Sequence, residues 1–287
     1  GIITAMQWHY SPWRPSFNID FGPIRHMFRY SVKVLATGII GHLNNNVLNI
    51  LLGRYFSPHA TGCYNQAYQW NSKCFYLVQG MVQQVAQPVL ADLKQEQARR
   101  LAALRKMVRF ASFISFPLLF GLGLISKEFI VLALTDKWLA SAELLQILCV
   151  SGAVMPLHTL MSNAILSCGR SDINLWCTCV LGVVEIALMV TIWPLGIRTM
   201  VTAYAVVNIL WVFVWLYFVR RLTGYGLVML LRDTLPFAIS ALGVMVVTYA
   251  ATSWTDNLWV HIISRIVLAA VLYYALMKAA KVQIMKE

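Results

Sequence analysis

Residues 173–193 read INLWCTCVLGVVEIALMVTIW, and this stretch decides the fold class. It carries a single ionisable carboxylate, Glu185, in an otherwise apolar run. A helix needs about 20 such residues to cross a hydrocarbon core of ~30 Å. The stretch therefore predicts a transmembrane helix.

The rest of the chain has the same character. Of 287 residues, 59% are hydrophobic and only 12% are charged, with a mean hydropathy of +0.67. Soluble domains carry about a quarter charged residues, so this chain cannot cover a soluble surface. We expect an all-α membrane protein in which six further spans are plain: Val34–Leu52, Phe110–Ile125, Leu144–Leu166, Met200–Val219, Leu235–Ala251 and Leu258–Met277.

An eighth span is predicted from charge rather than from hydropathy. Tyr64–Leu90 is rich in Gln and Asn, but counting it as a span places most of the 23 Lys and Arg residues on one side of the membrane. Cytoplasmic loops carry such an excess. We therefore expect about eight helices, both chain ends in the cytoplasm, a basic cytoplasmic loop at Asp92–Arg109, and Ser57–Thr61 outside. The net charge of +12 then reflects orientation in a membrane, not nucleic-acid binding.

The short loops predict that consecutive helices pack as antiparallel neighbours. We expect residues 34–219 to form a six-helix bundle and residues 220–287 to add two helices and a cytoplasmic C-terminus. Residues 1–33 are expected to hold the end of a preceding helix and a cytoplasmic connection. The chain begins at Gly1 with a short apolar stretch, which favours a truncated chain.

The predicted eighth span carries one polar line along a single helix face. Its members recur at spacings of three and four residues, which keeps them on one side of a helix. In hydrocarbon an unsatisfied polar group costs several kcal/mol, so the line must face water, a ligand or other helices. Its length favours a hydrated cavity over hydrogen bonds between helices. We call it the polar stripe: Gln66, Gln69, Lys73, Tyr76, Gly80, Gln83 and Gln87.

Two other predicted spans carry polar side chains that suit further cavity walls. In the first span these share one helix face, and in the span containing Pro156 they follow an expected kink, because proline removes a backbone hydrogen bond. The residues are His42, Asn45, Asn46 and Asn49, then His158 and Asn163.

Three charges lie deep in predicted spans: Lys73, Glu185 and Arg265. Each costs about 2.5–3.5 kcal/mol on an insertion scale, so each is a functional candidate. Lys73 is expected to contact a ligand or an ion pathway. Glu185 is either a structural ion-pair partner or a carboxylate that binds and releases a proton. Arg265 is expected to form an ion pair or to snorkel, with a transport role as the alternative, and its similar depth permits pairing with the other two.

Enzyme chemistry has no counterpart in the sequence. There is no phosphate-binding glycine loop, no metal-ligand motif and no nucleophile–base arrangement, so we expect no catalysis, metal or cofactor.

The segments Leu52–Pro58, LGRYFSP, and Gly62–Ala67, GCYNQA, resemble the Wzx-type polysaccharide flippases of the MOP exporter superfamily. Members often read LG…F…G-x-Y-x-x-A at this turn, and the basic loop after Leu90 also matches. The resemblance implies two six-helix bundles and an extra helix pair. This chain would be the second bundle with that pair, lacking an N-terminal six-helix half. Lys73 and the His42–Asn49 face would then line the cavity, and Arg265 would lie outside it.

The resemblance also implies a function. Such proteins flip an undecaprenyl-diphosphate-linked sugar unit, used for lipopolysaccharide O-antigen or capsule, across the inner membrane by alternating access. Membrane lipid and a coupling proton or sodium ion would be the other partners. Amide side chains both donate and accept hydrogen bonds to sugar hydroxyls, and Lys73 offers a point charge for a diphosphate.

Other functions remain open at the level of sequence. Within the superfamily, a lipid II flippase or a multidrug/cation antiporter is the alternative, although a cation exporter would favour acidic walls. Outside it, the alternatives are a membrane-bound polysaccharide polymerase or acyltransferase and a non-transporting assembly scaffold. Such enzymes usually need a large external loop or an intramembrane His–Asp/Arg constellation, which the sequence lacks.

Overall fold

The computed structural model describes residues 6, 8–10, 22–93, 96–252 and 258–279, and within these ranges every element is helical. The elements that follow the N-terminal residues run in this order: α2 (Gly22–Tyr55), α3 (Pro58–Asp92), α4 (Gln97–Leu124), α5 (Ser126–Leu134), η1 (Asp136–Trp138), α6 (Ala140–Gly152), α7 (Met155–Ser167), α8 (Ser171–Ile192), η2 (Trp193–Leu195), α9 (Ile197–Thr223), α10 (Leu227–Ala251) and α11 (Leu258–Ala279).

Six of the described helical segments are long and apolar enough to cross a membrane, with α6 and α7 together forming one of them. The fold class predicted from the sequence is confirmed. The helix α2, which contains the predicted span Val34–Leu52, is not among the six, and neither is α3. The expectation that α2 is plainly apolar was wrong. Helices α2 and α3 are both long and unusually polar for membrane helices.

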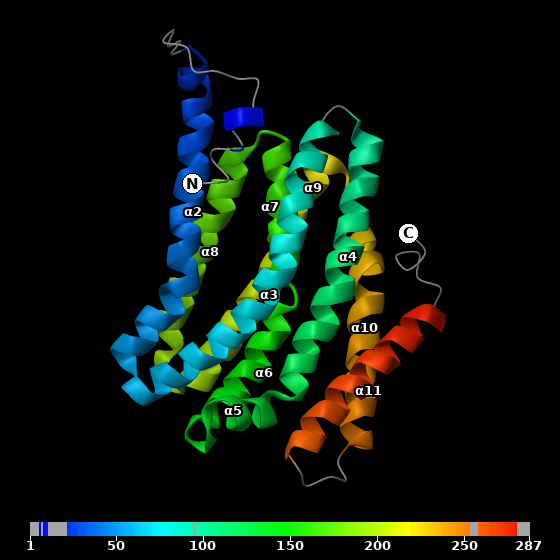
Figure 1. The fold of residues 1–287 in the computed structure, drawn as a ribbon. Helices are drawn as coiled ribbons and strands as arrows, with labels where there is room; N and C mark the ends of the chain where they lie inside the picture. The colour runs from blue at the N-terminus through cyan, green and yellow to red at the C-terminus, as the bar shows by residue number, and fades with distance from the viewer. Residues whose placement is uncertain (1–5, 7, 11–21, 94–95, 253–257, 280–287) are drawn as a thin grey trace.

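The helices α2 and α3 meet at one end of the molecule and separate toward the other (Figure 1). Along its length α2 packs against α8, whereas α3 packs against α4, α6 and α7. The turn between them is set by Ser57, whose hydroxyl accepts a hydrogen bond from the backbone N–H of Ala60 at 3.2 Å, and by Pro58 at the first helical position. A serine N-cap followed by proline is a strong helix start.

The helices α10 and α11 lie on the other side of α4 (Figure 1). Gly224 ends α9 in the left-handed conformation, with φ of 80°, and the chain then reverses into α10. A residue other than glycine would be strained there. The separate placement of α10 and α11 agrees with their expected role as an added pair, but the domain boundaries themselves stay predictions.

The segment Asp92–Arg109 was expected to be a loop, and this was wrong. Helix α4 begins at Gln97, so most of the segment is helical. Its Ala, Leu, Arg, Lys and Gln residues are all strong helix formers, and a cytoplasmic basic segment does not need to be irregular. At the other boundary, α2 begins at Gly22, well before the predicted start at Val34. Most of the predicted helix stub at Gly1–Tyr10 lies outside the described residues.

The predicted span Leu144–Leu166 is broken into α6 and α7, as the proline at position 156 indicated. At the break the Leu157 N–H donates to the Val154 carbonyl, three residues back, instead of to the Ala153 carbonyl. The hydroxyl of Ser115 on α4 donates a hydrogen bond to the Ala153 carbonyl at 2.8 Å. A neighbouring helix thus satisfies the freed carbonyl, which is the condition for an interrupted helix inside a membrane.

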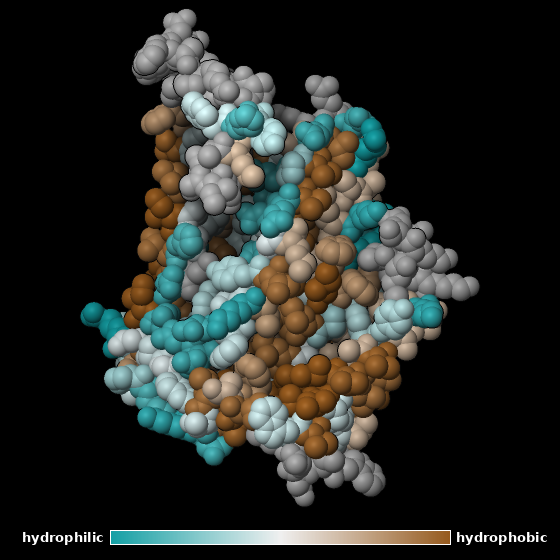
Figure 2. Space-filling view, in the orientation of Figure 1, coloured by the Kyte–Doolittle hydropathy of each residue, from teal (hydrophilic) through white to brown (hydrophobic). Residues whose placement is uncertain are grey.

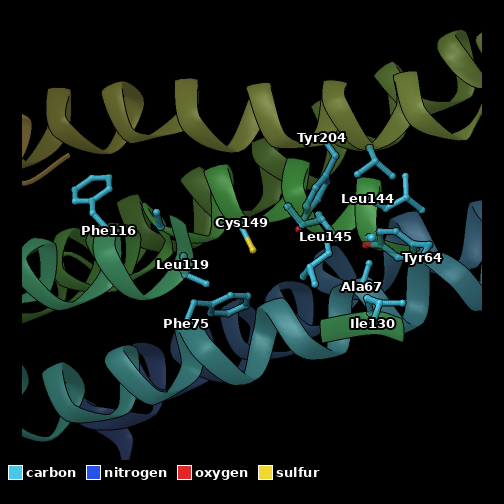
Figure 3. Close-up of a cluster of buried hydrophobic side chains, with 14 of the residues drawn as sticks. Tyr64, Ala67, Phe75, Phe116, Leu119, Ile130, Leu144, Leu145, Cys149 and Tyr204 are labelled. Atoms are coloured by element: carbon cyan, nitrogen blue, oxygen red, sulfur yellow. The ribbon is translucent and has the colours of Figure 1, made fainter. Parts of the chain in front are cut away.

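The core between α3, α6 and α9 is apolar. Figure 3 shows Leu144, Leu145 and Cys149 of α6 between side chains of α3 and α9, and all three are buried. Tyr64 from α3 and Tyr204 from α9 extend into the same cluster. This packing fixes α3 on one side only and leaves its opposite face uncovered.

Candidate functional site

The polar stripe lies on the uncovered face of α3. Among its members Gln69, Lys73, Tyr76, Gln83 and Gln87 are exposed, and Gln66 and Gly80 are half-buried. Figure 2 shows hydrophilic atoms gathered over the lower part of α3 and the region between α2 and α3. The stripe therefore does not serve to hold α3 against the described helices of this chain.

Lys73 sits in the middle of the stripe. Its Nζ atom lies 4.1 Å from the centre of the Trp70 ring, a cation–π contact that orients the ammonium group along the helix surface. The indole in turn packs edge-on against Phe129 of α5, with ring centres 4.8 Å apart. Lys73 forms no ion pair with a described residue, so its charge is available for an anionic ligand.

The asparagines of α2 do not all have the same surroundings. The side chain of Asn44 is buried, packs against Gly182 of α8 and donates to the Thr178 carbonyl at 2.8 Å. It joins α2 to α8 rather than facing a cavity. His42 and Asn46 are exposed, and the Asn46 amide donates to the His42 carbonyl at 2.8 Å. Asn49 is half-buried, and the side chain of Asn45 lies outside what the structure describes.

A buried polar cluster lies where α7, α8 and α9 meet. The Asn208 amide donates to Glu185 Oε1 at 2.9 Å and to the Tyr204 carbonyl at 2.9 Å. The Nε2–H of His158 donates to the Asn208 carbonyl at 2.9 Å, which fixes its tautomer. Glu185 is 2% exposed, and its Oε2 atom is buried with no hydrogen-bond partner among the described residues. We call Glu185, Asn208 and His158 the carboxylate cluster.

Tyrosines surround the carboxylate cluster. Tyr204 lies one helical turn before Asn208 on α9, and its carbonyl accepts from the Asn208 amide. Tyr64 and Tyr68 stack on α3 with ring centres 5.8 Å apart. The Tyr64 hydroxyl is buried without a described partner.

A second polar layer lies farther along α7 and α8. Ser162 donates to the Asn174 side chain at 2.7 Å, and Thr178 donates to the Asn174 carbonyl at 2.9 Å. The Gln79 amide of α3 donates to the Thr159 hydroxyl. Asn163 is buried, and its Nδ2 atom has no hydrogen-bond partner among the described residues. Much of this layer is satisfied, as expected of a polar seam inside a helix bundle.

Arg265 does not join these groups. Its Nη1 donates to Glu128 Oε1 at 2.8 Å, and its Nε donates to the Thr252 hydroxyl at 3.1 Å. His261 Nδ1 lies 3.2 Å from the same carboxylate oxygen. The ion pair that similar depth permitted between Arg265 and Glu185 is thus not formed. Arg265 instead joins α11 to α5, and Glu185 has an amide partner in place of a cation.

Sequence reasoning missed Asn208 and the tyrosines. Asn208 lies in an apolar run of α9, where a single membrane asparagine gives a signal that is easily read as packing. Tyr64 and Tyr204 look like ordinary aromatic residues until the fold brings α3, α6 and α9 together around one cluster. Among the predicted residues, the structure brings Glu185 and His158 together through Asn208, while the polar stripe lies outside.

Chemically, the arrangement offers two kinds of binding. The stripe presents amides and one ammonium on an open face, which suits a hydroxyl-rich anionic solute. The carboxylate cluster has an acceptor oxygen without a partner in a site of low polarity, which suits a proton or a small cation.

The sequence model of a family described as "Polysaccharide biosynthesis protein" matches residues 1–143. The teichuronic acid biosynthesis protein TuaB of Bacillus subtilis is 28% identical over 198 residues, which cover 69% of this chain and 41% of TuaB. The lipopolysaccharide biosynthesis protein WzxC of Escherichia coli is 25% identical over 162 residues, covering 56% of this chain and 33% of WzxC. The aligned regions span well under half the length of these curated relatives.

The fold also has a counterpart of known structure. The lipid II flippase MurJ, in an inward closed conformation, superposes with a TM-score of 0.69 over 96% of this chain and 58% of the MurJ chain. The sequences are 16% identical, so the likeness concerns the fold alone.

Proposed function

We propose that the chain belongs to the MOP exporter superfamily and moves a lipid-linked sugar precursor across a bacterial inner membrane. The match of residues 1–143 to a polysaccharide-biosynthesis family, the similarity to TuaB and WzxC, and the fold shared with the flippase MurJ support this proposal. The observation that carries the proposal is the polar stripe, a line of polar side chains along α3 that is largely exposed in the described structure.

The stripe would form the wall of the transport cavity. Amides along its length would exchange hydrogen bonds with sugar hydroxyls, and Lys73 would contact the diphosphate as a point charge. His42, Asn46 and Asn49 on α2 would supply the facing wall, since α2 and α3 separate from their common turn. The apolar lipid tail would stay in the bilayer while the polar head crosses. Alternating access would require the angle between the two helices to change.

The opposite wall would come from a second helical bundle. The aligned regions span 41% and 33% of the two relatives, and an exposed polar face on a membrane helix needs a cover or water. We propose an undecaprenyl-diphosphate-linked sugar unit as the cargo. We also propose that the chain is oriented with Gln97 on the cytoplasmic side of the membrane and His59 on the opposite side.

The carboxylate cluster would couple transport to an ion. Glu185 has one hydrogen bond, from an amide, and no cation within salt-bridge distance among the described residues. A proton or sodium ion could therefore bind there as the compensating charge.

The stripe is tested by replacing its charge. In the intact transporter expressed in cells, Lys73→Ala and Lys73→Gln should abolish export of the sugar unit without lowering the amount of protein in the membrane. Lys137→Gln is the matched control, because Lys137 is an exposed lysine in η1, away from the stripe. Normal surface polysaccharide from either Lys73 variant would overturn the role of this charge.

The alternative functions within the superfamily differ in the molecule that is moved, so a transport assay distinguishes them. Reconstituted protein should move a lipid-linked oligosaccharide between leaflets in vesicles. Movement of lipid II alone, or efflux of cationic drugs, would assign the chain to one of the other transporter classes.

A further inference from the structure

Tyr76 is the aromatic member of the polar stripe, and its side chain is 48% exposed. At a rise of about 1.5 Å per residue it lies halfway along α3, about 27 Å from the end at Pro58 and about 24 Å from the end at Asp92. Tyrosines of membrane helices gather at the two interfaces with water. Anchoring at an interface therefore does not account for a tyrosine at this place.

The ring of Tyr76 is held against a side chain of the core. Its centre lies 4.5 Å from the centre of the Phe75 ring, and the two ring planes are inclined by 51°. Phe75 is buried and points from α3 into the core cluster (Figure 3). Because a buried neighbour already restricts the Tyr76 ring, the entropic cost of ordering it against a ligand is small.

Gly80 leaves the Tyr76 ring uncovered. It follows Tyr76 by one turn on the same face of α3. Helical side chains lean toward the N-terminus of their helix, so a long side chain at position 80 would lie over the turn that carries Tyr76. Glycine has no side chain, and a Cβ built on it would meet no heavy atom within 4 Å. The space beside the ring is therefore open.

Polar groups border this open ring along the helix. Lys73 lies one turn before Tyr76 and Gln83 two turns after it, and both side chains are exposed. A pyranose ring has apolar C–H faces and a rim of hydroxyl groups. Its C–H face can cover an aromatic ring and remove apolar surface from water, while its hydroxyls exchange hydrogen bonds with an amide that both donates and accepts. The order of apolar and polar groups on α3 matches such a ring.

From this arrangement we propose that Tyr76 is the residue on which a sugar ring of the cargo stacks, over the space left open by Gly80. The inference rests on the proposed function and adds to it a residue that recognises the sugar part of the cargo rather than its phosphates. Stacking depends on the C–H face of the ring and not on one particular hydroxyl. The contact therefore selects for a pyranose that presents such a face toward α3.

Substitutions of Tyr76 test the stacking, with the rate of export of the sugar unit measured in cells that express the intact transporter. Tyr76→Leu should lower the rate about tenfold, which corresponds to about 1.4 kcal/mol of lost contact. Tyr76→Phe keeps the ring and should keep most of the rate. Tyr274→Leu, at a tyrosine of α11 that is 56% exposed, is the matched control and should change nothing. An equal loss in Tyr76→Phe and Tyr76→Leu would assign the role to the hydroxyl and overturn the stacking.

Substitutions of Gly80 test the same contact without touching the ring. Gly80→Ala should keep most of the export rate, because its methyl group meets no neighbour. Gly80→Leu should lower the rate as Tyr76→Leu does, because the longer side chain covers the ring. Its melting temperature in detergent should be unchanged or higher, since leucine forms helices better than glycine. Gly243→Leu on α10, at a glycine that is also exposed and open, is the control.

The two sets of variants separate this inference from the proposed function. The double variant Tyr76→Leu/Gly80→Leu should lose no more export than either single variant, because both changes remove one contact. Normal export by Tyr76→Leu or by Gly80→Leu, with Lys73→Gln inactive, would overturn the stacking and leave the proposed function standing. Additive losses in the double variant would also overturn it. Normal export by Lys73→Gln would count against the proposed function instead.

Discussion

At the scale of the residue, Glu128 and Glu185 have different roles because different side chains surround their carboxylates. Glu128 is held by Arg265 and His261, so it serves as an anchor between α5 and α11. Glu185 accepts a hydrogen bond from the Asn208 amide and forms no ion pair with a described residue. The sequence identified Glu185 and Arg265 as deep charges and left their pairing open. Only the packing of α5 against α11, which no local pattern reveals, assigns Arg265 to Glu128.

Glu185→Gln should leave the protein folded, because the new amide oxygen can still accept the hydrogen bond from Asn208. Transport by this variant should lose its dependence on pH or sodium, since the coupling ion no longer has a charged site. Transport assays in vesicles across a pH series and a sodium series measure this. Glu143→Gln at an exposed position is the control. Unchanged ion dependence in Glu185→Gln would remove the coupling role.

Glu128→Ala should destabilise the protein by about 3–5 kcal/mol, because it leaves the buried guanidinium of Arg265 without the carboxylate that balances its charge. The melting temperature in detergent, followed with the native tryptophans, should fall accordingly. Glu96→Ala breaks an exposed pair and should change stability by less than about 1 kcal/mol. Equal stability of the two variants would mean that Arg265 finds another partner.

At the scale of the element, the regular spacing of polar residues predicted a helix at α3, which its low hydropathy did not indicate. The polar stripe was read from its spacing, and α3 is a continuous helix with those side chains on its open face. The spacing of the asparagines in α2 does not reveal which of them is buried. The structure shows that Asn44 is buried, because Gly182 of α8 leaves room for its side chain. The helical start of α4 was missed because a run of basic residues resembles a loop until its helix propensity is weighed.

Ser115→Ala should lower the free energy of unfolding by about 1–3 kcal/mol, because the Ala153 carbonyl at the break between α6 and α7 loses its donor in a buried setting. Chemical or thermal unfolding in detergent measures the change. Thr202→Val, which removes an exposed hydroxyl bonded within α9, should alter stability much less. Indistinguishable unfolding of the two variants would show that the break does not depend on Ser115.

At the scale of the whole molecule, composition was enough to predict an all-α membrane protein. The charge rule predicted a span in the region of α3, which is a long helix but is not among the described helices apolar enough to cross a membrane, so that span stays a prediction. The sites depended on contacts distant in sequence, such as those of Asn208 on α9 with Glu185 on α8 and His158 on α7. Sequence alone therefore located the stripe but could not assemble the carboxylate cluster.

The orientation of the whole chain gives a prediction of its own. In a cysteine-free background, single cysteines replacing Gln97 and His59 should react from opposite sides of the membrane with an impermeant thiol reagent. The residue at position 97 should be protected in intact cells, and the residue at position 59 should label, because basic residues cluster at the start of α4. Equal labelling of both positions in intact cells would contradict this orientation.

The central claim is that the polar stripe faces water inside the membrane. Single cysteines at Gln69 and Gln83 on α3 should react in native membranes with a water-soluble methanethiosulfonate reagent. Cysteines at Val246 on α10 and Val267 on α11 are exposed in the structure as well, and they should remain unreactive because lipid covers them. Reactivity at the two α3 positions alone is the predicted result. An unreactive stripe, or equal reactivity on all three helices, would contradict the account.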